Sequence, residues 1–221
     1  SKAINYSDRD IAIYEYGKGM EEIKNCQLKM IGDPTTRYKE DPVRLLRAVR
    51  FAAKLGFSIE LDTQKPICEQ AHLLSHVPPA RLFEEILKLF LGGYATATYS
   101  LLRDYRLLDE LFPESFRVID NHPSYALLID EMIANTDKRI RTDKRVTPAF
   151  VYAALLWPAM HNEFLKLTAD GAPEVDAFAQ ACQKTISLQL QRIMIPKRFL
   201  IPMRQIWELQ WRLPKRQGNR A

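Results

Sequence analysis

The sequence has little glycine, few cysteines and no long apolar run. It contains only 8 glycines in 221 residues, and its long runs of Leu, Ala, Glu, Lys and Arg favour helices. Cys26, Cys68 and Cys182 are far apart and have no metal-binding or redox spacing, which indicates incidental thiols in a reducing compartment. No apolar run is long enough to cross a bilayer, and no secretory signal is visible at the start. We therefore expect a mostly α, cytoplasmic protein with no membrane partner.

Familiar catalytic motifs are also missing. The sequence has no Walker loop, no G-x-S-x-G, no H-E-x-x-H and no cysteine-rich zinc cluster. Glu69, His72 and His76 fall on one helical face, but nothing nearby completes a metal site, so solvated histidines are the simpler interpretation. Asp8 and Asp10 form a D-x-D, yet no glycine-rich loop precedes them. The residues alone therefore predict a binding module.

Nearly everything after Asp33-Pro34 has helical periodicity. The expected helices are Pro42–Leu55, Thr63–Leu74, Pro79–Leu91, Ala95–Asp104, Arg106–Leu111, Ser124–Ala134, Thr147–Trp157, Pro173–Ile193 and Lys197–Arg212. Short β-rich pieces at Ile11–Tyr16 and Gln27–Ile31 precede them and must either pair with a missing partner or pack on the helices. The charged segment Asn135–Arg145 is predicted to be an exposed linker or loop between two helical clusters.

Positive charge is concentrated in two places. The formal net charge is +5, but residues 192–221 hold eight basic residues against one acid, a local charge of +7. Residues 37–54 hold six basic residues against two acids, a local charge of +4. Two basic patches on an otherwise mildly acidic chain indicate a polyanion-binding protein. The alternative is that these residues only make two helices soluble.

The segment RYKEDPVRLLRAVRF, residues 37–51, combines a helix start with an acid pair and regularly spaced arginines. Asp41 is suited to cap a helix whose first residue is Pro42. A buried stripe is expected from Leu45, Leu46, Val49, Ala52 and Ala53. The opposite face is expected to carry Arg44, Arg47, Arg50 and Lys54, together with Phe51.

Asp41 and Arg44 are also suited to recognise a base. A carboxylate accepts hydrogen bonds and a guanidinium donates them in a planar fork, so the pair presents an acceptor beside a donor. Adenine and cytosine show the complementary pattern on their Watson–Crick edges, whereas guanine and uracil show the reverse. Glu40 would orient the guanidinium. The simpler alternative is that Asp41 only caps the helix and Arg44 only faces solvent.

The segment IGDPTTRYKEDPVRLLRAVRFAAKLGF, residues 31–57, resembles the junction of head and neck in the class II tRNA nucleotidyltransferase and bacterial poly(A) polymerase superfamily. In that family E-D-x-x-R recognises the nucleotide, and its Asp and Arg pair with the incoming base. The resemblance gives five candidate nucleotide-binding residues: Arg37, Glu40, Asp41, Arg44 and Arg47. The segment PPARLFEEILKLFLGG, residues 78–93, resembles the next neck motif, with Arg81, Glu84 and Lys88 at its polar positions. This segment and the tail look more like poly(A) polymerases than like CCA-adding enzymes.

The resemblance implies a three-part chain. Residues 1–36 would be the end of a nucleotidyltransferase head, residues 37–120 a helical neck with the nucleotide-recognition motif, and residues 121–221 a helical body with a basic RNA-binding end. The implied activity of the intact protein is ATP-dependent adenylate addition to RNA 3′ ends, in mRNA processing, with Mg²⁺ held by carboxylates of the head. Since those carboxylates lie earlier in the head, this chain alone is expected to be inactive, and a monomer is favoured. A CCA-adding enzyme is the alternative, because the Asp–Arg pair accepts A and C, and a non-catalytic RNA-binding module is a third possibility.

The basic end is expected to contact RNA. Arg204, Trp207 and Trp211 have the spacing of one helix face, and the two tryptophans are predicted to pack in the core. The basic residues are predicted to contact phosphates without reading sequence. These candidates are Arg198, Arg204, Arg212, Lys215, Arg216 and Arg220.

Overall fold

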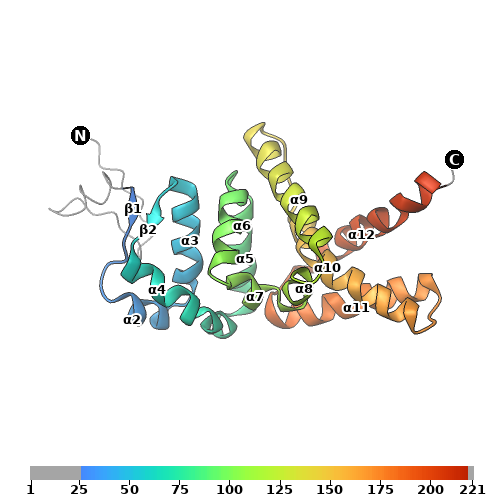
Figure 1. The fold of residues 1–221 in the computed structure, drawn as a ribbon, viewed down its shortest axis with the longest axis horizontal. Coiled ribbons are helices and arrows are strands. Elements are labelled where there is room, and N and C mark those ends of the chain that lie inside the picture. The colour runs from blue at the N-terminus through green and yellow to red at the C-terminus, as the bar shows by residue number, and fades with distance from the viewer. Residues whose placement is uncertain (1–25, 219–221) are drawn as a thin grey trace. The chain divides into compact units, whose positions relative to one another are not determined.

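The computed structural model describes residues 26–218, with side chains described as far as Leu213, and its regular structure is almost entirely helical (Figure 1). The elements are β1 (Gln27–Leu28), α2 (Pro34–Glu40), α3 (Val43–Leu55), β2 (Ser58–Ile59), α4 (Leu61–Glu69), the 3₁₀ helix η1 (Ala71–His76), α5 (Pro79–Phe90), α6 (Ala95–Asp104), α7 (Leu107–Leu111), α8 (Pro113–Ile119), α9 (Pro123–Arg141), α10 (Pro148–Ala169), α11 (Glu174–Arg192) and α12 (Lys197–Gly218). The mostly α prediction is confirmed. Asp8, Asp10 and the strand predicted at Ile11–Tyr16 lie outside the described residues.

The chain folds as two compact units. Of the described residues, the first unit comprises 26–77 together with Ala97–Glu110, and the second comprises Pro78–Thr96 and 111–218. The three-part division at residues 36 and 120 stays a prediction.

In the first unit, two short strands and helix α2 contact α3. Strands β1 and β2 pair in parallel, with Gln27 opposite Ser58 and Leu28 opposite Ile59, and both strands contact α3 (Figure 1). The predicted strand at Gln27–Ile31 therefore exists over two residues. Its partner is a strand that the sequence pattern did not reveal.

Two buried hydrogen bonds fix α2 and the chain before it against α4. The Met30 amide donates to Thr63 Oγ1 at 3.0 Å, and the Tyr38 hydroxyl donates to the Thr63 carbonyl at 3.1 Å. Tyr38 is completely buried. These bonds hold the last turn of α2, which carries Arg37 and Glu40.

Helix α3 buries more of its circumference than its sequence predicted. Leu45, Leu46, Val49 and Ala52 are buried as expected, but Arg44 and Phe51 are buried as well. The prediction that these two side chains lie on a solvent face is wrong. Elements α2, β1 and β2 all contact α3, and they cover part of the face that the helical pattern left open.

In the second unit, α10 is the central helix. It packs against α8, α9, α11 and α12, and α11 also contacts α5. The ring of Tyr152 lies 5.6 Å from that of Phe83 and 6.1 Å from that of Phe112, measured between centroids. Cys182 is buried in this unit, and burial raises its pKa to about 11, as expected for an inert thiol.

The linker predicted at Asn135–Arg145 is confirmed only for residues 142–145, which are exposed and non-helical, and is wrong for residues 135–141. Helix α9 continues to Arg141, and Asp137 is buried within it. The Asp137 carboxylate accepts hydrogen bonds from the amides of Ala95 and Thr96 at 2.6 and 2.9 Å, and from Thr96 Oγ1 at 2.8 Å. The charge density of the segment suggested solvent, but this carboxylate instead satisfies the free amides at the start of α6.

Several predicted helix boundaries also differ from the structure. Helix α10 passes through Pro158 and α12 passes through Pro214, so neither proline ends its helix. Proline removes one backbone donor, but packing of α10 on four neighbouring helices offsets that loss. The helix predicted at Thr63–Leu74 is divided between α4 and η1, and helices α2 and α8 were not predicted.

Candidate nucleotide-recognition site at the start of α3

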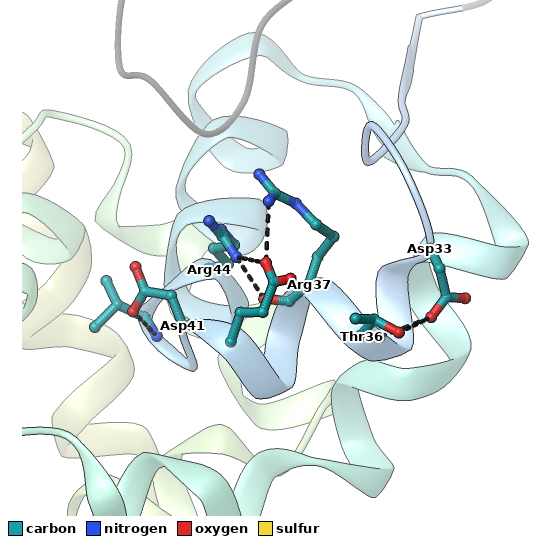
Figure 2. A network of polar contacts seen from close by, with 7 residues as sticks. Asp33, Thr36, Arg37, Asp41 and Arg44 are labelled. Atoms are coloured by element: carbon teal, nitrogen blue, oxygen red, sulfur yellow. Dashed lines mark hydrogen bonds and ion pairs between the residues drawn. The ribbon is translucent and has the colours of Figure 1, made fainter.

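Asp33 begins α2 and so determines where the site residues lie. Its Oδ2 accepts hydrogen bonds from the Thr36 amide at 2.8 Å and the Thr36 hydroxyl at 2.6 Å, and Pro34 occupies the first turn (Figure 2). This is a complete N-terminal cap. Helix α2 then ends at Glu40, so its last turn places Arg37 and Glu40 next to the start of α3.

Arg37 and Arg44 meet at one oxygen of Glu40 (Figure 2). The distances from Glu40 Oε2 to Nη1 of Arg37 and of Arg44 are 3.0 and 3.1 Å. Arg44 Nη1 also donates to the Arg37 main-chain carbonyl at 2.7 Å. Arg44 is only 7% exposed, whereas the Glu40 side chain is 51% exposed. The Arg44 guanidinium is therefore fixed by acceptors of α2.

Asp41 lies in the short turn between α2 and α3. It is half-buried, and its Oδ1 accepts a hydrogen bond from the Val43 amide at 3.3 Å (Figure 2). Pro42 occupies the N-cap position, so α3 begins one residue later than predicted. A bond of 3.3 Å is longer than the usual range for N–H···O bonds, which makes Asp41 a weaker cap than Asp33.

The structure brings together three of the five candidate nucleotide-binding residues. Arg37, Glu40 and Arg44 form one bonded cluster, and Asp41 directly follows Glu40 in the chain. Arg47 lies one turn beyond Arg44 on α3 and is half-buried. The Arg37 carbonyl was not predicted as a partner of Arg44, because a main-chain acceptor leaves no sequence signal.

The second family-like segment forms α5. Arg81, Glu84 and Lys88, its expected polar residues, are all exposed. Lys88 Nζ lies 3.0 Å from an oxygen of Glu85, whose side chain is buried. Glu85 was not singled out from the sequence, although its position on the apolar side of α5 is the available signal.

The basic end is divided between core and surface. Trp207 is buried and its Nε1 donates to the Ala153 carbonyl at 2.7 Å, and the Trp211 ring stacks on Phe178 with centroids 4.7 Å apart. Core packing is thereby confirmed for Trp207, whereas Trp211 is half-buried against its aromatic neighbour. Arg204 is exposed, so it does not share the buried face of Trp207. Arg198 and Arg212 are also exposed, and Arg212 forms an ion pair with Glu208.

Three other candidate basic residues are beyond the described side chains. They are Lys215, Arg216 and Arg220.

The described residues form neither a metal-binding group nor a membrane-spanning helix. Among them, no group of three or more His, Cys, Asp or Glu side chains is arranged to hold a metal ion. Glu69, His72 and His76 are exposed, and His72 Nδ1 lies 3.1 Å from the Glu69 carbonyl. In residues 26–218, none of the helices combines the length and the apolar character that a bilayer crossing needs.

Two family models match the chain. Residues 56–117 match "Probable RNA and SrmB- binding site of polymerase A", and residues 170–221 match "Polymerase A arginine-rich C-terminus". Helices α9 and α10 lie between these two segments.

Relatives and solved structures agree with these models. Poly(A) polymerase I of Escherichia coli O6:H1 is 43% identical over 222 residues, which cover 99% of this chain and 48% of that protein. A CCA-adding enzyme of Anoxybacillus flavithermus is 37% identical over 103 residues, which cover 44% of this chain and 26% of that enzyme. A solved structure titled "tRNA-processing enzyme (apo form 2)" has a TM-score of 0.50 and 17% identity, and the match covers 87% of this chain and 67% of that one.

Its sequence similarity to poly(A) polymerases and to CCA-adding enzymes makes the chain a member of the tRNA nucleotidyltransferase and poly(A) polymerase superfamily. Within that superfamily, the chain belongs to the bacterial poly(A) polymerase family. It spans about half the length of the curated poly(A) polymerases that it matches.

Proposed function

We propose that the whole protein adds adenylate residues from ATP to the 3′ ends of RNA, and that this chain selects the base and binds RNA. The observation that carries the proposal is the buried Arg44 guanidinium, which Glu40 and the Arg37 carbonyl hold at the start of α3, three residues after Asp41. The poly(A) polymerase relative, which matches along 99% of the chain, supports adenylate rather than CCA addition.

The proposed chemistry of base selection follows from the bonded cluster. Arg44 and Asp41 present a donor beside an acceptor, which complements the Watson–Crick edge of adenine and repels that of guanine. Glu40 is a positioning residue, because it bonds to Arg44 and Arg37 and prevents the guanidinium from turning away. Binding is stronger when such groups are ordered before the ligand arrives.

Mg²⁺ belongs to this proposal only for the whole protein. No carboxylate cluster among residues 26–213 fits a divalent cation, so we assign these residues no step in metal binding. Their proposed roles are hydrogen bonding to the base and contact with RNA phosphates.

Base preference in the complete protein tests the proposal. Arg44→Ala should lower the preference for ATP over GTP by about 5- to 150-fold, the equivalent of one bidentate base contact of about 1–3 kcal/mol. Arg44→Lys should also lose preference, because a lysine lacks the planar fork. Arg117, an exposed arginine paired with Glu114, provides the matched control Arg117→Ala. Unchanged ATP preference in a folded Arg44→Ala protein would refute base reading by this residue. Incorporation of CTP into tRNA ends would instead favour the CCA-adding alternative.

RNA binding is tested through salt dependence. Arg198, Arg204 and Arg212 are exposed on α12 and suited to contact phosphates. Replacing all three with alanine should weaken binding to every RNA sequence alike and reduce the log–log salt slope by about 0.7 for each lost contact. An unchanged slope with an intact fold would mean that these residues only keep the protein soluble.

A further inference from the structure

A groove of about 210 Å³ lies within the second unit, between α9, α10 and α12. Its deepest lining residues are buried and apolar: Met132, Ala153, Trp157 and Trp207. The groove is smaller than typical ligand pockets of about 300–1,000 Å³, a size that suits one planar ring system rather than a whole peptide helix. Its α9 and α10 walls lie outside both segments matched by the family models.

Polar side chains lie at the edge of this apolar groove. Glu131 and Asn135 are exposed and Gln210 is partly exposed. None of these three side chains takes part in a hydrogen bond or ion pair among the described residues. Each amide offers a donor and an acceptor, and the carboxylate accepts from an amino group. Apolar walls with such edge groups are the usual arrangement for binding an unstacked base.

Positive charge follows the groove along α9. Lys138 and Arg139 lie three and four residues after Asn135, so they share its side of the helix, and both are exposed. Arg139 Nη2 donates to the Arg145 carbonyl at 3.3 Å, which keeps the exposed Lys144 and Arg145 at the same end. Lys138 and Arg139, on the side of α9 that Asn135 shares, are suited to contact the phosphates that flank a bound base.

We propose that this groove binds one adenine base of single-stranded RNA. The inference rests on the proposed function, because the adenylated 3′ end is the adenine-rich strand that the whole protein would hold. The Glu131 carboxylate can accept from the amino group of adenine, and the amides of Asn135 and Gln210 can complement its donor and acceptor. The groove would thus be a contact for the product strand, separate from the recognition of incoming ATP.

Binding of labelled oligo(A) and oligo(U) of equal length, measured by fluorescence anisotropy without ATP, tests this assignment. The protein is expected to prefer oligo(A). Ala154→Phe places a ring at a half-exposed lining position and should reduce oligo(A) affinity about tenfold, the value of one stacked base, with a smaller effect on oligo(U). Gln210→Ala should reduce the preference for A over U. The matched control Gln205→Ala lies on the exposed side of the same helix and should leave this preference unchanged.

The possible outcomes separate this proposal from the proposed function. Equal binding of oligo(A) and oligo(U) by the unchanged protein would overturn the adenine assignment. So would equal loss of both ligands in Ala154→Phe, because a groove that only contacts the chain does not read the base. Arg44→Ala should keep the preference for oligo(A), since Arg44 lies in the other unit. If Arg44→Ala loses ATP selection but keeps its preference for oligo(A), both the nucleotide-recognition site at Arg44 and the groove are supported. If Arg44→Ala keeps ATP selection, only the site at Arg44 is refuted.

Discussion

The chain contains two Asp-Pro helix starts eight residues apart, and they use the same local sequence differently. At Asp33-Pro34, the residue three positions after the aspartate is Thr36, which donates two short hydrogen bonds to the carboxylate. At Asp41-Pro42, the corresponding residue is Arg44, whose guanidinium donates to Glu40 and the Arg37 carbonyl. The Asp41 carboxylate accepts a longer hydrogen bond of 3.3 Å from the Val43 amide.

This difference shows how a folding signal can become a binding site. The Asp33 carboxylate is fully engaged in starting α2, so it contributes to stability. The Asp41 carboxylate caps its helix start through a longer bond, and the Arg44 guanidinium is held by acceptors of α2. Because a site must keep its groups aligned before the ligand arrives, α2 stabilises the arrangement that α3 alone would not hold.

The largest expected effect comes from a third aspartate that caps a helix from a distance. Asp137 is 3% exposed and accepts three hydrogen bonds at the start of α6. Asp137→Ala should lower the free energy of unfolding by about 3 kcal/mol, because it leaves buried amides without a partner. Urea denaturation measures this loss. Asp130→Ala, at an exposed position of the same helix, is the control, and equal midpoints for the two variants would contradict the capping role.

Local patterns predicted most helices but not which charged residues are buried. The bounds of α6 were predicted correctly, since glycine and apolar spacing are local signals. The burial of Arg44 depends on α2, and that of Asp137 depends on residues 41 and 42 positions away. Charge-rich segments were therefore assigned to solvent because their partners are distant in sequence. The E-D-x-x-R motif indicated the candidate site, but not the carbonyl that fixes its arginine.

An intermediate effect is expected at Asp33. Asp33→Ala removes both bonds from Thr36 and should lower the Tm by about 2–4 °C, as for the loss of a helix cap. Asp62→Ala, an exposed carboxylate in the first turn of α4, should change the Tm less. A similar Tm for both variants would remove the contrast between a capping aspartate and an ordinary helix-start aspartate.

The pH dependence of stability provides a second test of the capping role of Asp33. Hydrogen bonds from Thr36 lower the pKa of Asp33 below its ordinary value. Its contribution to stability is therefore complete above the unfolded pKa of about 3.9 and is lost as the pH falls through the lower folded pKa. The Tm difference between the unchanged protein and Asp33→Ala should be constant near neutral pH and shrink below about pH 4. A difference that grows on acidification would exclude this linkage.

The smallest effect on stability is expected at Asp41, where the two helix starts differ most. The capping bond from the Val43 amide to its carboxylate is longer than the usual range, so Asp41→Ala should shift the Tm by only about 1–2 °C. Asp41→Asn should shift it less, since asparagine caps almost as well. If Asp41 accepts from the amino group of adenine, Asp41→Ala should still reduce ATP preference in the complete protein, whereas Asp33→Ala should leave it unchanged. A Tm loss at Asp41 equal to that at Asp33, with ATP preference intact, would make both aspartates simple caps. A small Tm loss with reduced ATP preference at Asp41, and a larger Tm loss with unchanged ATP preference at Asp33, would show that Asp33 stabilises the fold and Asp41 recognises the base.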